Sequence, residues 1–190
     1  MPHQRSELET SKTPPLVLHG INLTLLPADL LLVVGKPGSG KSSLLYSLMG
    51  ETVRNGGSDE VKGRIAHVDK ATFIFPGTVK ENICFGLEFA ECRFRKAAMA
   101  ALLDGEFPEK GWNTVIGERD GSATSIISTS QKIRIGLARA LYSGADIFLI
   151  DDALAGLDPP LARTIFNETI KKILANKIVI FVTSQVEFLP

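Results

Sequence analysis

The segment that most restricts the fold is a glycine-rich run between a short apolar stretch and a helix-forming one. It reads Gly35-Lys36-Pro37-Gly38-Ser39-Gly40-Lys41-Ser42 and matches the pattern GxxxxGK[ST]. The apolar stretch before it, Leu30–Val34, is typical of a buried parallel strand. The residues after it, from Lys41 to Met49, are typical of a helix. A strand, a glycine-rich turn and a helix in this order predict an α/β fold whose turn wraps around an anion.

The residue types in this turn indicate a nucleoside triphosphate. Glycine permits the backbone to curl so that successive N–H groups face phosphate oxygens, and the following helix adds its positive end. Lys41 is placed to reach the β- and γ-phosphates, and Ser42 to ligate Mg²⁺. The alternative is a chance turn before a helix, but the flanking elements argue against it. We therefore predict ATP and Mg²⁺ as ligands of a phosphate turn formed by Gly35, Lys36, Pro37, Gly38, Ser39, Gly40, Lys41, Ser42 and Ser43.

A second candidate element is a pair of carboxylates that follows an apolar strand. The run Asp146–Ile150 predicts a buried strand that leads into Asp151 and Asp152. Ligands of parallel sheets bind beyond the carboxyl ends of the strands, so this pair should lie beside the phosphate turn. Asp151 is placed to hold Mg²⁺, and Asp152 to orient an attacking water. The alternative, a pair that only caps a loop, loses weight once the phosphate turn is present.

The rest of the chain alternates strands and helices around a helical block. Apolar residues with helical spacing run from Thr78 to Tyr142, and a polar stretch within them, Gly105–Ser130, is expected to be a long surface loop. The other expected elements are strands near a hairpin over Leu16–Leu25, strands at Arg64–Val68 and Lys177–Thr183, a polar loop over Glu51–Lys62, and a helix from Pro159. This order predicts a parallel-sheet core that carries a helical lobe.

Composition excludes several classes of protein. The chain has 190 residues, 44% apolar and 22% charged, which is typical of a globular domain with a real core. Lysine plus arginine and aspartate plus glutamate both number 21, so no basic field indicates a nucleic-acid or anionic-membrane partner. The apolar runs are too short to span a bilayer, so any membrane connection is expected through another chain or another part of a longer one.

Four residues with reactive or aromatic side chains are expected to have structural roles. Cys84 and Cys92 lack a metal-ligand pattern and are interpreted as reduced thiols that pack in the helical lobe. Trp112, on the long polar stretch, is interpreted as a packed loop anchor and not as a partner contact. His67 falls in an expected strand and is interpreted as structural and not as a ligand.

Taken in order, the motifs resemble those of ATP-binding-cassette domains. Between the phosphate turn and the aspartate strand, Ile127–Gln131 is similar to the LSGGQ signature of that family. Leu137–Ala140 stands at the spacing of the family's LARA-type residues, and Ala155–Asp158 follows the aspartate strand as expected. Thr78–Ile83 is similar to the start of the family's helical lobe, and Thr114–Glu118 to the exporter-type loop that faces the membrane domains.

The resemblance covers about residues 15–190 and is closest to the first nucleotide-binding domain of the C subfamily, the multidrug-resistance-associated and chloride-channel group. It implies an α/β fold: a P-loop NTPase parallel-sheet core with a small antiparallel β portion and an inserted helical subdomain. We expect a disordered lead-in over residues 1–15 and a cassette over 16–190, truncated at its C-terminus. The core is expected at 16–75 and 143–190, and the helical subdomain at about 76–142.

The resemblance also implies a function and a set of partners. Cassettes of this family work as head-to-tail pairs, in which the phosphate turn of one faces the signature of the other, and closure drives transmembrane domains. Ser128 and Gln131 of the signature, and Lys70 in the loop after Val68, are thereby expected to contact nucleotide. The domain is expected at the cytoplasmic side of a membrane, held there by its transporter, with no nucleic-acid partner.

Departures from the family pattern lie where hydrolysis is controlled. Asp152 replaces a catalytic glutamate and is one methylene shorter; a shift of about 1 Å can cost about 10²-fold in rate. Ser184 replaces the switch histidine near the γ-phosphate, and Lys70 replaces a glutamine. Thr129 and Ser130 replace two signature glycines and add side chains where the backbone should approach a phosphate.

These departures predict a site that binds ATP and hydrolyses it slowly, with weak ATPase activity in the isolated domain. One alternative is a regulatory ATP-binding module of a channel or transporter that never hydrolyses ATP and acts by occupancy. Another is a soluble cassette protein of the translation or DNA-repair type, which the exporter-like loop and the balanced charge argue against. Residues 1–20 contain no aromatic ring to stack on adenine, so the position of that contact stays open.

Overall fold

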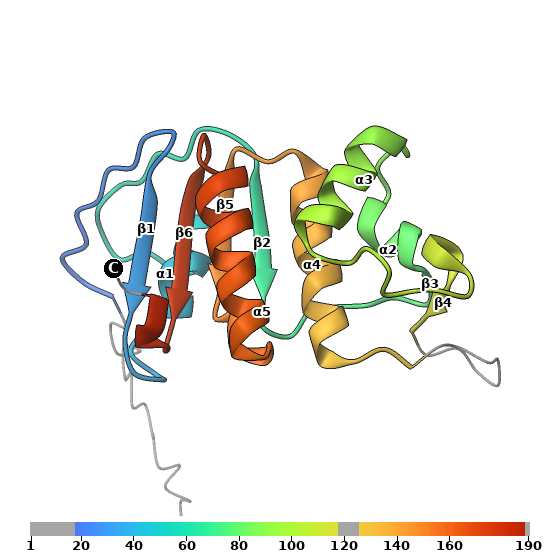
Figure 1. Ribbon diagram of the computed structural model, residues 1–190. Helices are drawn as coiled ribbons and strands as arrows, with labels where there is room; N and C mark the ends of the chain where they lie inside the picture. Colours follow the sequence, from blue (N-terminus) through green and yellow to red (C-terminus); the bar gives the residue numbers. More distant parts are fainter. Residues whose placement is uncertain (1–17, 118–125, 189–190) are drawn as a thin grey trace, which may run out of the picture.

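The computed structural model describes residues 18–117 and 126–188, and a parallel β-sheet lies at its centre (Figure 1). The four strands have the order β1-β6-β5-β2, and each neighbouring pair is parallel. Their bounds are β1 Leu30–Val34, β2 Ile65–Asp69, β5 Ile147–Asp151 and β6 Ile178–Thr183. The four strands expected from the apolar runs are confirmed, with bounds that differ by no more than one residue.

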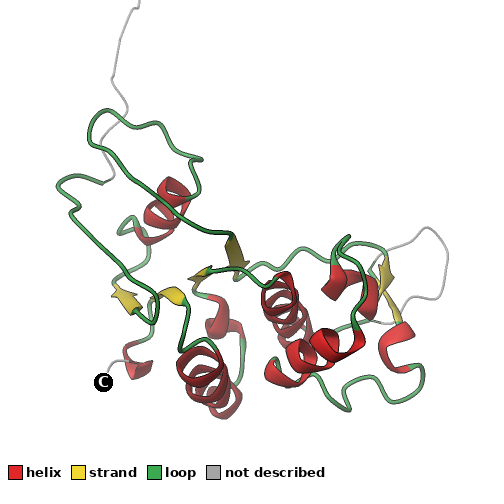
Figure 2. Cartoon of the chain, turned by 90° about the horizontal axis from the view of Figure 1, so that it is seen from above, coloured by secondary structure: helices red, strands yellow, loops and turns green. Residues whose placement is uncertain are grey.

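Helices cover both faces of this sheet, as Figure 2 shows from above. Helix α1 (Lys41–Leu48) packs through Leu45 on one face, in a small cluster that includes Leu149 of β5. The opposite face carries the larger core, with Phe148 of β5 and Phe166 of η3. The helices on this second face are α4 Thr129–Ser143, α5 Pro159–Thr164 and its π-helical continuation η3 Ile165–Ile173. Each central strand is apolar on both faces because both faces are covered.

A helical part lies beyond strand β2, at the right of Figure 1. It contains α2 (Val79–Cys84) and α3 (Glu91–Ala100), which both pack against α4. A short antiparallel pair, β3 (Gly77–Thr78) with β4 (Val115–Ile116), closes this part. Helix α4 also contacts β2 and therefore joins the helical part to the sheet. The expected fold class is confirmed: a parallel-sheet core, a helical subdomain and a small antiparallel portion.

The expected strands over Leu16–Leu25 are wrong where the structure describes this stretch. From residue 18 to 25 the backbone forms no strand, and Ile21 and Leu23 are 58% and 42% exposed. A period-two pattern yields a strand only where a neighbouring strand accepts its hydrogen bonds, and the described residues place none beside it. The antiparallel portion is instead the pair β3 and β4 in the helical part. The lead-in over residues 1–15 lies outside the described residues.

The stretch Gly105–Ser130 contains more structure than the expected loop. It includes the 3₁₀ turn η1 (Gly111–Asn113) and strand β4, and α4 already begins at its end. Trp112 lies edge-on to Phe94 with ring centroids 5.2 Å apart, so the interpretation as a packed anchor is confirmed. Residues 118–125 lie outside the described part. The loop Glu51–Lys62 is confirmed, since no helix or strand falls within it.

The two cysteines differ in their surroundings. Cys84 is buried at the end of α2, and burial raises the pKa of its thiol. Cys92 is exposed near the start of α3, so the expectation that it packs inside the helical lobe is wrong. Its position in the first turn of an amphipathic helix puts it on the solvent side, opposite Phe94, which is buried.

Candidate functional site: a phosphate turn at the strand ends

The phosphate turn joins β1 to α1 and has the backbone that the glycines predict. Gly38 and Gly40 have φ values of 79° and 89°, in the left-handed region that favours glycine. A Cβ at Gly35 would lie 2.8 Å from Oγ of Ser39, so a larger residue here would have to displace that side chain. The turn is fastened by the Ser39 N–H, which donates to the Lys36 carbonyl at 3.2 Å. The strand, turn and helix expected here are therefore present.

The side chain of Lys41 folds back over this turn. Its Nζ donates to the carbonyl oxygens of Gly35 and Lys36, both at 2.8 Å. Helix α1 begins after Gly40 without a side-chain cap, so its first N–H groups are available to an anion. The Lys41 ammonium and the free N–H groups at the start of α1 together form the set of donors that phosphate oxygens require.

Asp151 ends strand β5 and is 5% exposed. It pairs in register with Val182 of β6 and with Asp69 of β2. No hydrogen bond to its carboxylate is formed by the described residues. A buried carboxylate without a partner is costly, and a cation removes that cost. The oxygen atoms of Ser42 and Asp151 are ligands of the kind that Mg²⁺ prefers, so both residues fit the predicted metal position.

The two expected catalytic positions, Asp152 and Ser184, are in direct contact. The Asp152 carboxylate accepts from the Ser184 N–H at 3.2 Å and from its hydroxyl at 3.2 Å, on different oxygens. It also accepts from the hydroxyl of Thr183 at 3.2 Å. The Asp152 backbone has φ 48°, and its N–H donates to the Val182 carbonyl at 2.8 Å. The short carboxylate is therefore held against the end of β6.

The loop after β2 starts at Lys70, which is exposed. An arginine of α4, Arg139, holds this loop in place; the sequence motif Leu137–Ala140 contains it but predicts no role for it. Arg139 of α4 donates through Nε to the Asn82 carbonyl at 2.8 Å and through Nη2 to the Phe73 carbonyl at 2.9 Å. Its guanidinium also lies 4.4 Å from the centre of the Phe85 ring. Burial lowers the pKa of Arg139. An arginine in an otherwise apolar helix face is the sequence signal that indicates such a role.

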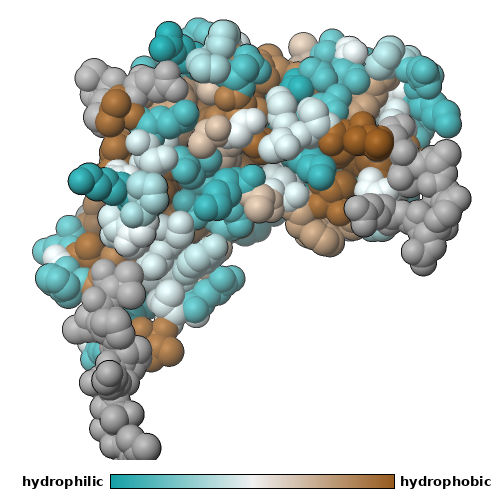
Figure 3. Space-filling model, turned by 90° about the horizontal axis from the view of Figure 1, so that it is seen from below, coloured by the Kyte–Doolittle hydropathy of each residue, from teal (hydrophilic) through white to brown (hydrophobic). Residues whose placement is uncertain are grey.

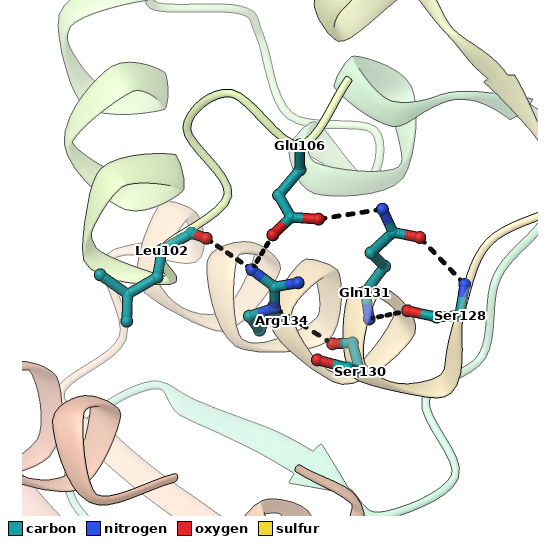
Figure 4. Close-up of polar contacts among 6 residues, drawn as sticks. All are labelled: Leu102, Glu106, Ser128, Ser130, Gln131 and Arg134. Carbon is teal, nitrogen blue, oxygen red and sulfur yellow. Dashed lines mark hydrogen bonds and ion pairs between the residues drawn. The ribbon is translucent and has the colours of Figure 1, made fainter. Parts of the chain in front are cut away.

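The signature segment forms the start of α4. Ser128 caps the helix: its hydroxyl accepts from the Gln131 N–H at 3.1 Å, and Gln131 Oε1 accepts from the Ser128 N–H at 2.9 Å (Figure 4). Gln131 Nε2 donates to Glu106 at 3.0 Å. Both ends of the Gln131 amide are therefore bonded within the chain. Thr129 and Ser130 are the first helical residues of α4. The spacing S-x-x-Q is a capping box, which stabilises a helix start.

Glu106 is a residue of this region that the motifs did not indicate. It accepts from Arg134 Nη1 at 2.7 Å, and the same nitrogen donates to the Leu102 carbonyl at 2.6 Å (Figure 4). Arg134 is 5% exposed, so the ion pair lies largely out of water. The hydrogen bond from Arg134 lowers the pKa of Glu106, against the opposing effect of burial. This network joins the first turns of α4 to the segment that follows α3.

The expected site residues divide into two groups. Each residue of the first group lies at, or directly after, the carboxyl end of a parallel strand, and so at one end of the sheet: the phosphate turn, Lys70, Asp151, Asp152 and Ser184. Helix α4, which Ser128 caps, begins at the same end of the molecule but beyond β2, while the turn follows β1 at the opposite edge of the sheet (Figure 1). Strands β6, β5 and β2 lie between the turn and the start of α4. The turn and the signature of one chain therefore do not share a phosphate.

Viewed from this end, the sheet part presents mixed hydrophilic and hydrophobic residues and no large uniformly hydrophobic field (Figure 3). A polar end with a phosphate turn and a buried carboxylate suits a charged ligand more than an apolar one. The fold and this site together define a nucleotide-binding domain of the P-loop class.

Comparison with known proteins identifies the family. Residues 18–155 match the family model described as ABC transporter. Human "ATP-binding cassette sub-family C member 4" is 42% identical over 95% of this chain, and the mouse protein of that name is 41% identical over 90%. The Drosophila melanogaster "Probable multidrug resistance-associated protein lethal(2)03659" is 36% identical over 94%. The chain spans 13% of the length of each of these relatives.

This chain belongs to the ABC transporter family. It is an ATP-binding domain homologous to the multidrug resistance-associated proteins, so the resemblance to the C subfamily is confirmed. Domains of this family generally bind ATP with Mg²⁺ and work with a second nucleotide-binding domain and with transmembrane domains. Across residues 18–117 and 126–188, no helix has the length and apolar character needed to cross a membrane.

Proposed function

We propose that this domain binds MgATP in its phosphate turn and couples that binding to substrate transport by transmembrane domains outside this chain. The observation that carries the proposal is the turn itself: Lys41 Nζ lies over two backbone carbonyls at 2.8 Å, at the uncapped start of α1. A triphosphate supplies oxygens to this ammonium and to the N–H groups around it. Mg²⁺ supplies the positive charge that the buried Asp151 carboxylate lacks. The domain works at the cytoplasmic side of the membrane.

A second nucleotide-binding domain completes the site. The signature of this chain starts at Ser128, separated from its own phosphate turn by strands β6, β5 and β2, so each turn needs the signature of a partner. The Ser128 hydroxyl accepts the cap bond and retains its own proton, which it can donate to a phosphate of the partner's nucleotide. Gln131 has both ends of its amide bonded, and it contributes by holding this cap in place. A head-to-tail pair of cassettes has this arrangement.

Hydrolysis at this turn is slow. A carboxylate that orients water must be able to point toward that water. Both oxygens of Asp152 already accept from Ser184, and one also accepts from Thr183. Ser184 stands where the family has a histidine and has no ring nitrogen to offer a phosphate. Nucleotide binding, and not rapid turnover, therefore supplies most of the free energy that shifts the cassette pair between open and closed forms.

The contact between Asp152 and Ser184 also supports a second candidate, a regulatory ATP-binding module of a channel or transporter. Such a module never hydrolyses ATP and acts through occupancy of the turn. Calorimetric binding of MgATP and phosphate release, measured on the same sample with a partner cassette that has an intact signature, distinguish the two. Binding with slow release supports the motor, binding without release supports the module, and absence of binding contradicts both.

A further inference from the structure

We infer that Asp69, at the end of β2, supplies a second carboxylate to the Mg²⁺ position beside Asp151 and Ser42. The inference rests on the proposed binding of MgATP. It concerns a residue that neither the motifs nor the family pattern singled out, and it follows from where the sheet and α1 place the side chain.

The first observation is the pairing of two carboxylates across neighbouring strands. Asp69 of β2 is in register with Asp151 of β5 in a parallel pair. Such strands lie about 4.8 Å apart, and residues in register point to the same face of the sheet. Leu149, two residues before Asp151, packs in the cluster under α1. Both carboxylates therefore lie on the face that α1 covers.

The second observation shows which residues of α1 and β2 lie at the same level along the strand direction. The Tyr46 ring of α1 lies edge-on to the His67 ring of β2, with centroids 6.0 Å apart. Ser42 is one helical turn before Tyr46, about 5.4 Å nearer the phosphate turn. Asp69 is two residues after His67, about 6.6 Å further in the same direction. Ser42 and Asp69 therefore reach the same level, above the end of β5.

The phenol of Tyr46 is consistent with this placement. Its pKa is raised by burial, and then by the charges of Asp69 and Asp151. Both carboxylates are thus near the same face of α1, one turn from Ser42.

The third observation concerns partners of the carboxylates. Asp69 Oδ1 accepts from the Ala71 N–H at 3.2 Å, which orients the group and leaves Oδ2 free to bind a cation. Asp151 is 5% exposed, and its carboxylate forms no hydrogen bond within residues 18–117 and 126–188. Two carboxylates on neighbouring strands repel each other, and a divalent cation between them offsets that repulsion. Lys70 replaces the family's glutamine and brings a positive charge in place of an amide oxygen; Asp69 supplies an anionic oxygen next to it.

The experiment uses Mn²⁺ as the probe and Asp69→Asn as the main variant. Asparagine keeps an oxygen that accepts from the Ala71 N–H, so the substitution removes the charge and retains the turn. Free Mn²⁺ is measured by electron paramagnetic resonance in titrations of the ATP-loaded chain, after excess ATP, which itself binds Mn²⁺, is removed by gel filtration. We expect Asp69→Asn to weaken Mn²⁺ binding by about tenfold. Asp104→Asn, the same change at an exposed residue of the helical part, should bind Mn²⁺ like the unmodified chain.

A second readout follows ATP without metal, in the presence of a chelator. Because Asp69→Asn removes a negative charge near the triphosphate, it should bind metal-free ATP at least as tightly as the unmodified chain. Opposite effects with and without metal distinguish a ligand from a residue that only supports the fold. If Asp69→Asn is not folded by circular dichroism, Asp69→Ser repeats both titrations with a hydroxyl that can keep the turn.

The outcomes separate this inference from the proposed function. If Asp69→Asn retains Mn²⁺ like the unmodified chain while Asp151→Asn loses it, Asp69 is not a ligand and the proposed function stands. If the unmodified chain itself does not retain Mn²⁺ with ATP, the proposed function fails and the inference fails with it. Loss in Asp69→Asn and in Asp151→Asn, without loss in Asp104→Asn, supports a site with two carboxylates.

Discussion

The hydroxyl of Ser184 donates to the carboxylate of Asp152 at 3.2 Å, and the Ser184 N–H donates to the other oxygen at the same distance. Both residues depart from the family pattern, and the fold joins them directly. Residues that share hydrogen bonds at one site do not act independently. The two departures therefore act together as one change in the site, in which the short carboxylate of Asp152 accepts hydrogen bonds from Ser184.

The first prediction is that restoring either residue alone has little effect. Asp152→Glu lengthens the carboxylate side chain to that of the family's glutamate but leaves the γ-phosphate contact missing. Ser184→His restores that contact but leaves the carboxylate of residue 152 one methylene short. A positioned base contributes about 10²–10⁴-fold to a rate. We expect the double variant to raise turnover well above the product of the two single effects. The measurement is steady-state phosphate release, with a partner cassette that has an intact signature. Full activity from Asp152→Glu alone would make Ser184 incidental.

The second prediction concerns pH and the ion pair of Glu106 with Arg134. Arg134 lowers the pKa of Glu106 in the folded chain, so the pair stabilises the fold above the unfolded-state pKa of glutamate. This contribution is lost as pH falls through the folded pKa. Glu106→Gln should therefore reduce the free energy of unfolding by about 1–2 kcal/mol at neutral pH and by much less in acid.

Urea unfolding at neutral and acid pH measures this difference. Glu109→Gln, at an exposed residue nearby, is the matched control and should follow the unmodified chain at both pH values. An equal loss of stability for Glu106→Gln at both pH values would show that its charge is not the source of the effect.

The third prediction is that Arg139 cannot be replaced by lysine. Its guanidinium donates to the carbonyls of Asn82 and Phe73 and stacks on Phe85, while a lysine ammonium is a point donor on a flexible stem. Arg139→Lys should lower the free energy of unfolding by about 1–2 kcal/mol. Arg95→Lys, at an exposed pair on α3, should change it by less than about 0.5 kcal/mol. Equal effects of the two substitutions in urea unfolding would contradict this role.

The fourth prediction is that the chain does not form a stable homodimer. In a symmetric pair, Thr129 and Ser130 would present side chains to both nucleotides where the family has glycine. Light scattering with excess MgATP should give the mass of a monomer. A tight ATP-dependent homodimer with rapid turnover would instead indicate an ordinary active cassette.

Local pattern was sufficient for the sheet and for the phosphate turn. Leu30–Val34 and the residues before Asp151 form short apolar runs, and such runs are typical of buried strands. The glycines between β1 and α1 permit the left-handed backbone that the phosphate turn adopts at Gly38 and Gly40. The pattern at residues 18–25 was misleading because a strand needs a neighbour, which no local pattern provides.

Contacts that depend on the fold were beyond local pattern. Glu106 and Arg134 are 28 residues apart and meet only after α3 and α4 pack. Asp69 and Asp151 face each other because β2 lies beside β5, which the sequence order of the strands does not reveal. In contrast, Ser128 and Gln131 form a capping box, and the local pattern S-x-x-Q is sufficient to predict one. The resemblance to the family signature predicts nucleotide contact for the same two residues.

The proposed function depends on binding of MgATP by the phosphate turn through Lys41, and isothermal titration calorimetry measures that affinity. Lys41→Ala removes the ammonium that lies over the turn, and a hydrogen bond to a charged group contributes about 1.5–3 kcal/mol. We predict that Lys41→Ala binds MgATP at least about tenfold more weakly than the unmodified chain. Lys96→Ala, at an exposed lysine of α3, should bind like the unmodified chain, with both variants folded by circular dichroism. Equal MgATP affinity for Lys41→Ala and the unmodified chain would contradict the proposed function.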